Sequence, residues 1–309
     1  DPKEKPSSQK LKSLLAIVET MVAEQDTAKL PKLDRVLLEK AILETYERLG
    51  RLGRVPILSD LMETCAQSEE PSLRVISKLL FTWTGDRPYG KLLDRQSAFK
   101  TNSTVTAFDL KGLSAYPDLQ SVVILILADF ILTQVEQNRE RPTRVVLDEV
   151  WQQLKSPAAS DLMEYLARTV RKTGSGVTFI TQGVEEIVAS QIGPAILNNT
   201  ATKFVMLQRG DTKVLQEVLK LNAKELALIL SLGQKKGTYS EGFMIEGDHR
   251  QVVRIYPQPL DYWLSTSDAK DNQFLETQMK THNLGLIDGL KKAAEVAPLG
   301  VAQMESRAA

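Results

Sequence analysis

The sequence predicts an α/β fold in which an all-helical segment precedes a mostly parallel sheet covered by helices. Apolar residues recur at helical spacing between Leu11 and Trp83, and after Gly85 short β-rich runs alternate with helical segments. Such alternation is typical of parallel strands, because each crossover between them needs a dozen or more residues. We therefore expect an all-helical subdomain over residues 1–84, an α/β core over 85–266 and a helical or disordered tail over 267–309.

The helical segment contains several expected helices. Apolar residues at positions 11, 14, 15 and 18 lie on one face of a helix, as do those at 36, 37, 42 and 43. A third helix is expected after Ser59, with Glu63 at the reciprocal capping position, and a fourth from Pro71, because proline is favoured in a first helical turn. The most apolar run, residues 122–132, is about half as long as a membrane span and contains Asp129, so it is interpreted as a buried core helix.

The expected strands of the sheet are rich in β-branched and aromatic residues. They cover residues 105–110, 144–148, 177–181 and 203–207. A hairpin is expected next, because residues 238–245 and 251–256 flank the turn-forming residues 246–249. Beyond Ser265 the chain is polar and then weakly amphipathic, which fits either a peripheral helix or disorder.

The composition excludes several classes of protein. Lys+Arg and Asp+Glu number 39 each, so no global field draws the chain to nucleic acid or to an anionic membrane, and any contact with DNA would be local. Cys65 is the single cysteine, which excludes an intramolecular disulfide framework. The first residues lack the apolar core of a secretion signal, so the cytoplasm is the expected compartment.

Residues 144–149 (RVVLDE) carry the strongest local signal. An apolar strand delivers two adjacent carboxylates at its carboxyl end, which is the edge where open α/β sheets bind ligands. A carboxylate at this place can hold Mg²⁺, usually through water, and a second acid can deprotonate an attacking water. Asp148 is the candidate for the metal and Glu149 for the base. The alternative is a pair of acids that only favour the start of the next helix.

Residues 177–182 (VTFITQ) form a second apolar strand that ends in polar residues. If this strand neighbours the Asp148 strand, Gln182 lies near the terminal phosphate of a bound nucleotide. An amide there can donate to a phosphate oxygen and accept from water. The alternative is a glutamine that only closes a loop. The order of the two strands, with a helix between them, makes the pair more specific than either member.

The residues between these strands predict an amphipathic helix. Its apolar side carries Leu162, Met163, Leu166 and Val170, and its polar side carries Asp161, Glu164, Arg168, Arg171 and Lys172. The bases concentrate in the last turn, where an arginine could reach a phosphate in a neighbouring subunit. The alternative is a solvated face with ion pairs such as that of Glu164 with Arg168.

Residues 85–91 (GDRPYGK) match most of the spacing of a phosphate-binding loop. Leu92 stands where the motif needs Ser or Thr, and the segment contains Pro88 and follows a helical region rather than a buried strand. We therefore expect no phosphate site here. The histidines and Cys65 lack metal-ligand spacing, so no metal site of that kind is expected.

Taken together, these residues resemble the TraC-like ATPases of conjugation and type IV secretion, a family that includes TraC, TrwK and TrbE, over about residues 55–266. The segments that carry the resemblance are 56–61 (PILSDL), 89–94 (YGKLLD), 106–113 (TAFDLKGL), 146–151 (VLDEVW), 171–174 (RKTG), 181–182 (TQ) and 237–241 (GTYSE). The last segment resembles a hairpin of the F-type TraC branch.

The resemblance implies a RecA-like P-loop NTPase motor domain with an all-helical insert, and ATP and Mg²⁺ as cofactors. It implies that Asp148 serves Mg²⁺, Glu149 the lytic water and Gln182 the γ-phosphate. Arg171 would be the arginine finger, with Arg168 and Lys172 as further nucleotide contacts.

The resemblance also implies a cellular setting. Members of the family power pilus and channel assembly and DNA–protein transfer, commonly as homo-hexamers on the cytoplasmic side of the bacterial inner membrane. The implied partners are inner-membrane components and the coupling ATPase of a type IV secretion system.

The family's Gly-rich Lys-Ser/Thr loop precedes the helical insert, and nothing before Leu11 matches that loop. We expect the chain to be a portion of a longer motor that does not hydrolyse ATP efficiently by itself; the alternative is a degenerate motor. Two rival functions stay open. One is a DNA-pumping ATPase of the FtsK/HerA type, and the other is a catalytically inactive scaffold for secretion-system assembly.

Overall fold

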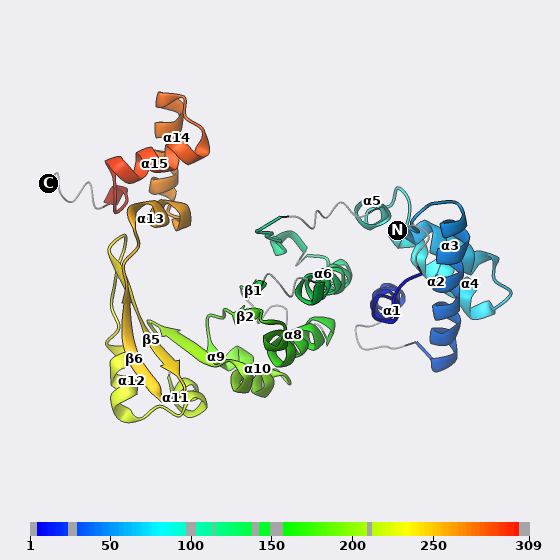
Figure 1. Cartoon of the computed structure of the whole chain (residues 1–309), viewed down its shortest axis with the longest axis horizontal. Helices are drawn as coiled ribbons and strands as arrows, with labels where there is room; N and C mark the ends of the chain where they lie inside the picture. Colours follow the sequence, from blue (N-terminus) through cyan, green and yellow to red (C-terminus); the bar gives the residue numbers. More distant parts are fainter. Residues whose placement is uncertain are drawn as a thin grey trace. The chain divides into compact units, whose positions relative to one another are not determined.

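The computed structural model describes residues 5–23, 30–96, 103–113, 115–137, 142–148, 157–208 and 212–302. The chain divides into two compact units, residues 1–199 and 200–309. The first unit consists of helices with a small sheet, and the second contains a long hairpin with helices near both of its ends (Figure 1). Each unit has buried apolar clusters of its own.

The first unit begins with packed helices. They are α1 (Ser8–Val22), α2 (Lys32–Arg51), α3 (Leu58–Gln67), α4 (Pro71–Leu80), the short η1 (Phe81–Trp83) and α5 (Gly90–Leu93). Their apolar faces meet in one core that contains Leu38 and Trp83. The Trp83 indole N–H donates to the Met21 carbonyl at 2.9 Å. Helices cover most of the described residues between 11 and 83, as expected, and the predicted start of α4 at Pro71 is confirmed.

The start of α3 differs from the expectation. α3 begins at Leu58, so Ser59 lies inside its first turn rather than before it. The Ile57 amide donates to the Asp60 carboxylate at 2.9 Å, and the Ser59 amide donates to Asp94 at 2.9 Å. Carboxylates therefore satisfy amides that a helix leaves open at its start, and one of them comes from a residue distant in sequence.

The long apolar helix of this unit is α6 (Pro117–Gln137). It packs against α1 and against α8 (Pro157–Thr169), and Val122 and Ala128 are buried in two different clusters. By length and composition alone, α6 is the one helix in the described part of the chain that could cross a membrane. Its packing against two neighbouring helices agrees with the core helix expected from residues 122–132.

Two of the expected strands pair with each other in this unit. β1 (Arg144–Leu147) and β2 (Gly176–Phe179) run parallel, with Leu147 opposite Phe179. A buried cluster of Ala128, Val145 and Leu166 joins α6, β1 and α8. The short helices α9 (Val184–Val188) and α10 (Gly193–Asn199) follow β2. The parallel pairing that the alternating pattern predicts is confirmed for these two strands.

The expected strand over residues 105–110 is wrong. These residues belong to no strand, the side chain of Val105 is 84% exposed, and the short helix η2 (Lys111–Leu113) follows. A β-rich run forms a strand only when a neighbour takes up its backbone N–H and C=O groups. Among the described residues, no segment pairs with this one.

The second unit contains an antiparallel sheet. Its elements are β3 (Thr202–Met206), α11 (Lys213–Leu219), α12 (Ala223–Leu230), β4 (Gln234–Lys235), β5 (Tyr239–Glu246) and β6 (His249–Ile255). The expected hairpin is confirmed, since β5 and β6 are joined by a two-residue turn with Glu246 opposite His249. β5 also pairs with β3 and β4.

The prediction that the strand over residues 203–207 belongs to the parallel sheet is wrong, because β3 pairs antiparallel with β5. Val205 lies opposite Phe243, and both side chains are buried. β5 is longer than β3 and pairs with it along its whole length, and a buried apolar cross-strand pair such as Val205 with Phe243 stabilises a sheet. Tertiary pairing therefore outweighs the alternation of strands and helices along the sequence.

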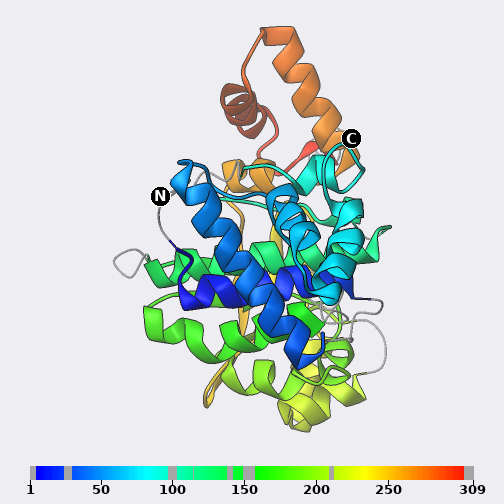
Figure 2. The same cartoon turned by 90° about the vertical axis from the view of Figure 1, so that its right-hand side faces the viewer.

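The described chain after the hairpin, up to residue 302, contains three helices, which fits the helical form expected for this part of the tail. α13 (Pro259–Ser265), α14 (Ala269–His282) and α15 (Leu286–Val296) share a cluster built on Trp263, Leu290 and Ala293. α14 and α15 lie side by side (Figures 1 and 2). The Trp263 indole N–H donates to the Ala297 carbonyl at 2.8 Å, which ties the end of the described chain to α13.

Candidate functional site

The carboxyl edge of the parallel strand pair brings two predicted site residues together. The Ile180 amide donates to the Leu147 carbonyl at 2.9 Å, so the pairing continues to the last residue of β1. Asp148 follows that residue directly, and Gln182 lies two residues beyond Ile180. Both side chains are exposed. The sequence argument placed Gln182 near Asp148 only if their two strands are neighbours. β1 and β2 do pair with each other.

Glu149, the candidate base, lies outside the described residues, as does Trp151 of the same segment. In the sequence, Glu149 comes two positions after Leu147, the last residue of β1. Its role stays a prediction from the sequence.

The turn that carries Gln182 is held by hydrogen bonds on both sides of it. The Thr181 hydroxyl lies 2.8 Å from a Glu186 carboxylate oxygen in the first turn of α9 and 3.0 Å from the Gly183 carbonyl. The Gly183 amide approaches the same hydroxyl at 3.4 Å. Thr181 therefore joins the end of β2 to α9. The Thr-Gln pair of the sequence combines a positioning hydroxyl with an exposed amide.

The basic residues lie on the outer face of the helix between the strands, as expected. Met163, Leu166 and Val170 are buried, at 2%, 0% and 5% exposure. The side chains of Asp161 and Leu162, which the sequence assigned to the two faces, lie outside the described part of this helix. The predicted apolar side of the helix is thus confirmed for these three residues. The charged residues lie on the opposite face of the helix, toward solvent.

The charged residues of that face differ in their surroundings. Arg168 pairs with Glu164 at 2.7 Å, and the Arg168 side chain is 60% exposed. Arg171 and Lys172 lie in the short helix η3 (Val170–Thr173) and are both exposed. The predicted Glu164–Arg168 pair is confirmed, and an exposed i,i+4 pair of this kind contributes only about 0.3–0.5 kcal/mol.

The bases and the acid lie at opposite edges of the strand pair. η3 leads into β2 through Gly174, and the Gly176 amide donates to the Thr143 carbonyl at the amino end of both strands. β2 has 4 residues, so at roughly 3.3 Å per residue the two edges are about 13 Å apart. Arg171 and Lys172 therefore do not share an edge with Asp148 and Gln182 of the same chain.

The loop-like segment 85–91 has a structural role. The Gly85 amide donates to the Asp94 carboxylate at 2.7 Å, which is the kind of contact a phosphate would make in a phosphate-binding loop. A side chain at Gly90 would collide with the backbone of Thr84 and Gly85. The protein's own carboxylate occupies this turn, which agrees with the rejection of a phosphate site here.

Asp94 was not singled out in the sequence, yet it joins two of the segments that carry the resemblance. Its carboxylate also accepts from the Ser59 amide at 2.9 Å and from the Ser59 hydroxyl. It thereby caps the start of α3 from the end of α5. The spacing of 35 residues between the partners leaves no local signal for this contact.

We expect Asp94→Ala to lower the free energy of unfolding of the helical part by about 1–3 kcal/mol, because it removes a helix cap and leaves amides without an acceptor. Hydrogen exchange of the α3 amides measures the effect. Asp86→Ala, an exposed aspartate in the same turn, is the matched control. Equal exchange in both variants would contradict a capping role for Asp94.

The hairpin segment 237–241 is likewise explained by packing. Gly237 has a φ of +70°, and a side chain there would collide with the Leu299 carbonyl. Glu241 accepts from the Arg254 guanidinium at 2.6 and 2.8 Å and from the Gly233 amide at 2.7 Å. These bonds to Gly233 and Arg254 hold the pKa of Glu241 below its usual range. The segment therefore holds β5 to β6 and to the chain before β4.

The carboxyl edge fits a magnesium ion that arrives with a nucleotide. Mg²⁺ in phosphate sites is held by one or two carboxylates together with waters and substrate phosphates. Asp148 offers one exposed carboxylate at this edge. Within the described ranges, no group of three or more His, Cys, Asp or Glu side chains is placed to hold a metal. The donor set therefore suits a metal shared with phosphates rather than one caged by protein.

Parallel strands covered by helices, with polar residues at their carboxyl edge, are a feature of the nucleotide-binding α/β class. The family model described as the TraG P-loop domain matches residues 73–296. The chain belongs to this family.

Relatives with curated descriptions share a segment of the chain. Conjugal transfer protein TrbE of Rhizobium radiobacter is 22% identical over 172 residues, which are 54% of this chain and 21% of TrbE. Type IV secretion system protein virB4 of Bartonella quintana is 23% identical over 173 residues, 55% of this chain and 21% of that protein. A probable TrbE conjugal transfer protein of Sinorhizobium fredii matches at 22% identity over 26% of its length. The chain thus corresponds to a minor portion of each relative.

A solved structure has the same fold. VirB4 of Thermoanaerobacter pseudethanolicus aligns with a TM-score of 0.61 at 21% sequence identity, covering 82% of this chain and 70% of that one. The likeness extends over most of the chain and supports the P-loop NTPase fold. Specific likeness to the TraC branch rests on residues 237–241 alone.

Proposed function

We propose that the protein to which this chain belongs is an ATP-hydrolysing motor of a conjugative type IV secretion system, of the TraC-like type. The observation that carries the proposal is the pair Asp148 and Gln182 at one carboxyl edge, inside a chain of the TraG P-loop domain family. The names of the matched relatives, a conjugal transfer protein and a type IV secretion system protein, supply the cellular setting.

The proposed roles follow from the chemistry of each side chain. Asp148 would hold Mg²⁺ through water, and a bound Mg²⁺ would supply positive charge beside the phosphates. Glu149 accepts a proton from the attacking water, and Gln182 hydrogen-bonds the γ-phosphate. The hydroxyl of Thr181, held against Glu186, limits the positions that Gln182 can take.

The proposed assembly is a homo-hexamer at the cytoplasmic face of the bacterial inner membrane. The motor would act with inner-membrane components and the coupling ATPase of the secretion system, on a DNA–protein substrate or on pilus subunits. The outward position of Arg168, Arg171 and Lys172 supports such a ring, because in a neighbouring subunit these bases can meet phosphates that they do not meet in their own.

In the full-length protein, we expect Glu149→Gln to keep ATP binding but to lower turnover by about 10²-fold or more, because the amide cannot accept the proton from water. Nucleotide affinity and hydrolysis are measured separately. Glu217→Gln, which removes the same charge from an exposed position on α11, is the matched control and should leave turnover unchanged. Normal turnover in Glu149→Gln would exclude Glu149 as the base.

A further inference from the structure

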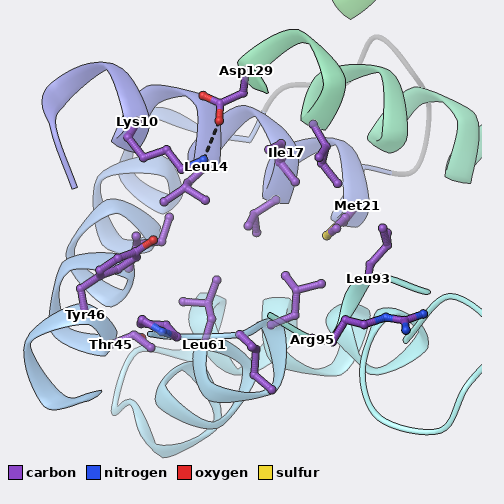
Figure 3. A pocket seen from close by; sticks show the side chains of 16 residues that line it. Lys10, Leu14, Ile17, Met21, Thr45, Tyr46, Leu61, Leu93, Arg95 and Asp129 are labelled. Carbon is purple, nitrogen blue, oxygen red and sulfur yellow. Dashed lines mark hydrogen bonds and ion pairs between the residues drawn. The ribbon is translucent and has the colours of Figure 1, made fainter. Parts of the chain in front are cut away.

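A cavity of about 220 Å³, open to solvent on one side, lies among the helices of the first unit (Figure 3). Its wall comes from α1, α2, α3 and α6, together with the chain at the end of α5. Protein interiors are close-packed, and voids larger than a water molecule are few. An apolar cavity of roughly 150 Å³ is enough to hold a six-carbon ring such as benzene. It is large enough for a small organic molecule.

Most of the wall is aliphatic. Leu14 and Ile17 come from α1, Ile42 from α2, Leu61 from α3 and Ile126 from α6. Water in such a space finds few hydrogen-bond partners, whereas a hydrocarbon removes apolar surface from water when it enters. The wall therefore favours an aliphatic guest over solvent.

One end of the cavity is polar, and its two charges pair with each other. The third charged group of the lining, the Arg95 guanidinium, donates to two carbonyls of α5. The Lys10 ammonium pairs with the Asp129 carboxylate at 2.5 Å, and Figure 3 shows this pair at the edge of the aliphatic side chains. The Lys10 side chain is 44% exposed and that of Asp129 is 14% exposed, so this end leads toward solvent. Tyr46 lines the same cavity. Burial and the charge of Asp129 raise the pKa of Tyr46, so its hydroxyl stays protonated at neutral pH.

This polar end discriminates among head groups by charge. A hydroxyl or amide can accept a hydrogen bond from Lys10 and donate one to Asp129. A carboxylate would lie beside the Asp129 carboxylate, and an ammonium beside the Lys10 ammonium, so each would meet a like charge in a partly buried place. A neutral head group that both donates and accepts is the best match.

We propose that this cavity binds a small neutral molecule with an aliphatic body of about six carbons and a hydroxyl or amide end. The aliphatic body lies among the side chains of α1, α2, α3 and α6. The head group lies at the Lys10–Asp129 pair. This site is separate from the carboxyl edge of β1 and β2 and does not depend on the proposed ATPase activity.

The test compares 1-hexanol, hexanoate and hexylammonium, titrated at pH 7 into the 309-residue chain with labelled isoleucine methyl groups. We expect saturable one-to-one binding of 1-hexanol that shifts the methyl signals of Ile17, Ile42 and Ile126. Hexanoate and hexylammonium should bind at least about tenfold more weakly. Equal binding of the three probes, or no saturable binding of 1-hexanol, would overturn the proposal.

Two pairs of variants locate the bound molecule. Leu14→Phe places a larger side chain in the cavity and should abolish binding, whereas Leu11→Phe, the same change at a half-buried position of α1 outside the wall, should not. Asp129→Asn leaves the Lys10 charge unpaired, so hexanoate should then bind more tightly than 1-hexanol. Asp118→Asn on the exposed start of α6 should keep the original order. If Leu14→Phe binds 1-hexanol normally, or Asp129→Asn keeps the original order, the assigned cavity or its polar end is wrong.

Discussion

Arg171→Ala in the full-length protein is expected to lower ATP turnover by roughly 10³–10⁵-fold, the range that an arginine finger contributes. Arg171 is exposed on η3, and the buried side chains of Leu166 and Val170 fix the helix that leads to it. It lies at the amino edge of the strand pair, away from Asp148. In the proposed ring, Arg171 meets a phosphate bound to the neighbouring subunit, so nucleotide binding to the mutant's own site should persist.

Mixing two inactive variants tests whether Arg171 acts between subunits. Rings assembled from Arg171→Ala and Glu149→Gln chains contain interfaces where an intact Glu149 meets an intact Arg171 of the neighbour, so partial turnover should return. Activity of the unmodified protein should also rise more steeply than linearly with concentration near the assembly threshold. Arg74→Ala, an exposed arginine on α4, is the matched control.

A negative result in the mixing experiment has a clear meaning. If mixed rings are shown to form and no turnover returns, Arg171 does not act in a neighbouring subunit. The exposed bases are then a solvated helix face, as the Glu164–Arg168 pair already is.

Asp271→Ala is expected to lower the local stability of the α13–α15 helices by about 3–5 kcal/mol. Asp271 is 1% exposed and accepts from the Tyr262 hydroxyl at 2.6 Å, the Thr266 hydroxyl at 2.9 Å and the Val301 amide at 2.9 Å. The Lys236 ammonium lies 3.6 Å away. Removal of the carboxylate leaves several donors without an acceptor in a buried place.

Hydrogen exchange of the α14 amides measures this loss, because a chain of two units need not unfold in one step. Asp288→Ala, at a position of α15 whose side chain is 68% exposed, is the matched control. Protection in Asp271→Ala equal to that in the control would contradict the role of Asp271 as the hub of these helices.

The same residue predicts a dependence on pH. Burial alone would raise the pKa of Asp271, but the hydrogen bonds from Tyr262, the Val301 amide and Thr266, with the charge of Lys236, hold it below its usual range. Its contribution to stability is therefore complete above the unfolded pKa of about 3.9 and is lost as the pH falls through the lower folded pKa. In Asp271→Asn, the protection of α14 should lose this part of its acid dependence.

Local sequence patterns were sufficient for many of the elements. A strand beginning at residue 144 and a hairpin turning within residues 246–249 were predicted, because runs of β-branched residues and turn residues act over a few positions. The structure ends the strand at Leu147 and shortens the turn to two residues. The buried stripe of Met163, Leu166 and Val170 was predictable from helical period alone. The order of two acid- and amide-ended strands with a helix between them also predicted that Asp148 and Gln182 share an edge.

Contacts between distant residues were not predictable in this way. Asp94 caps α3 across 35 residues, and Asp271 accepts from Val301 across 30 residues. No local pattern around either aspartate indicates its distant partner. The direction in which β3 pairs, and the lack of any partner for residues 105–110 among the described residues, depend on which strand is nearby rather than on the residues of the strand itself.

The sequence by itself therefore determined most of the helices and strands and the outward position of Arg168, Arg171 and Lys172. It also supplied the candidate residues at the carboxyl edge of the β1–β2 pair. Periodicity and the residue types at strand ends are local properties, so both could be predicted. Only the tertiary structure decided that β3 pairs with the hairpin strand β5 and that Arg171 and Asp148 lie at opposite edges of the β1–β2 pair. It also decided that the Asp94 carboxylate accepts the hydrogen bond of the Gly85 amide. These outcomes depend on which distant segment satisfies a backbone group or buries an apolar face, and no local pattern encodes that choice.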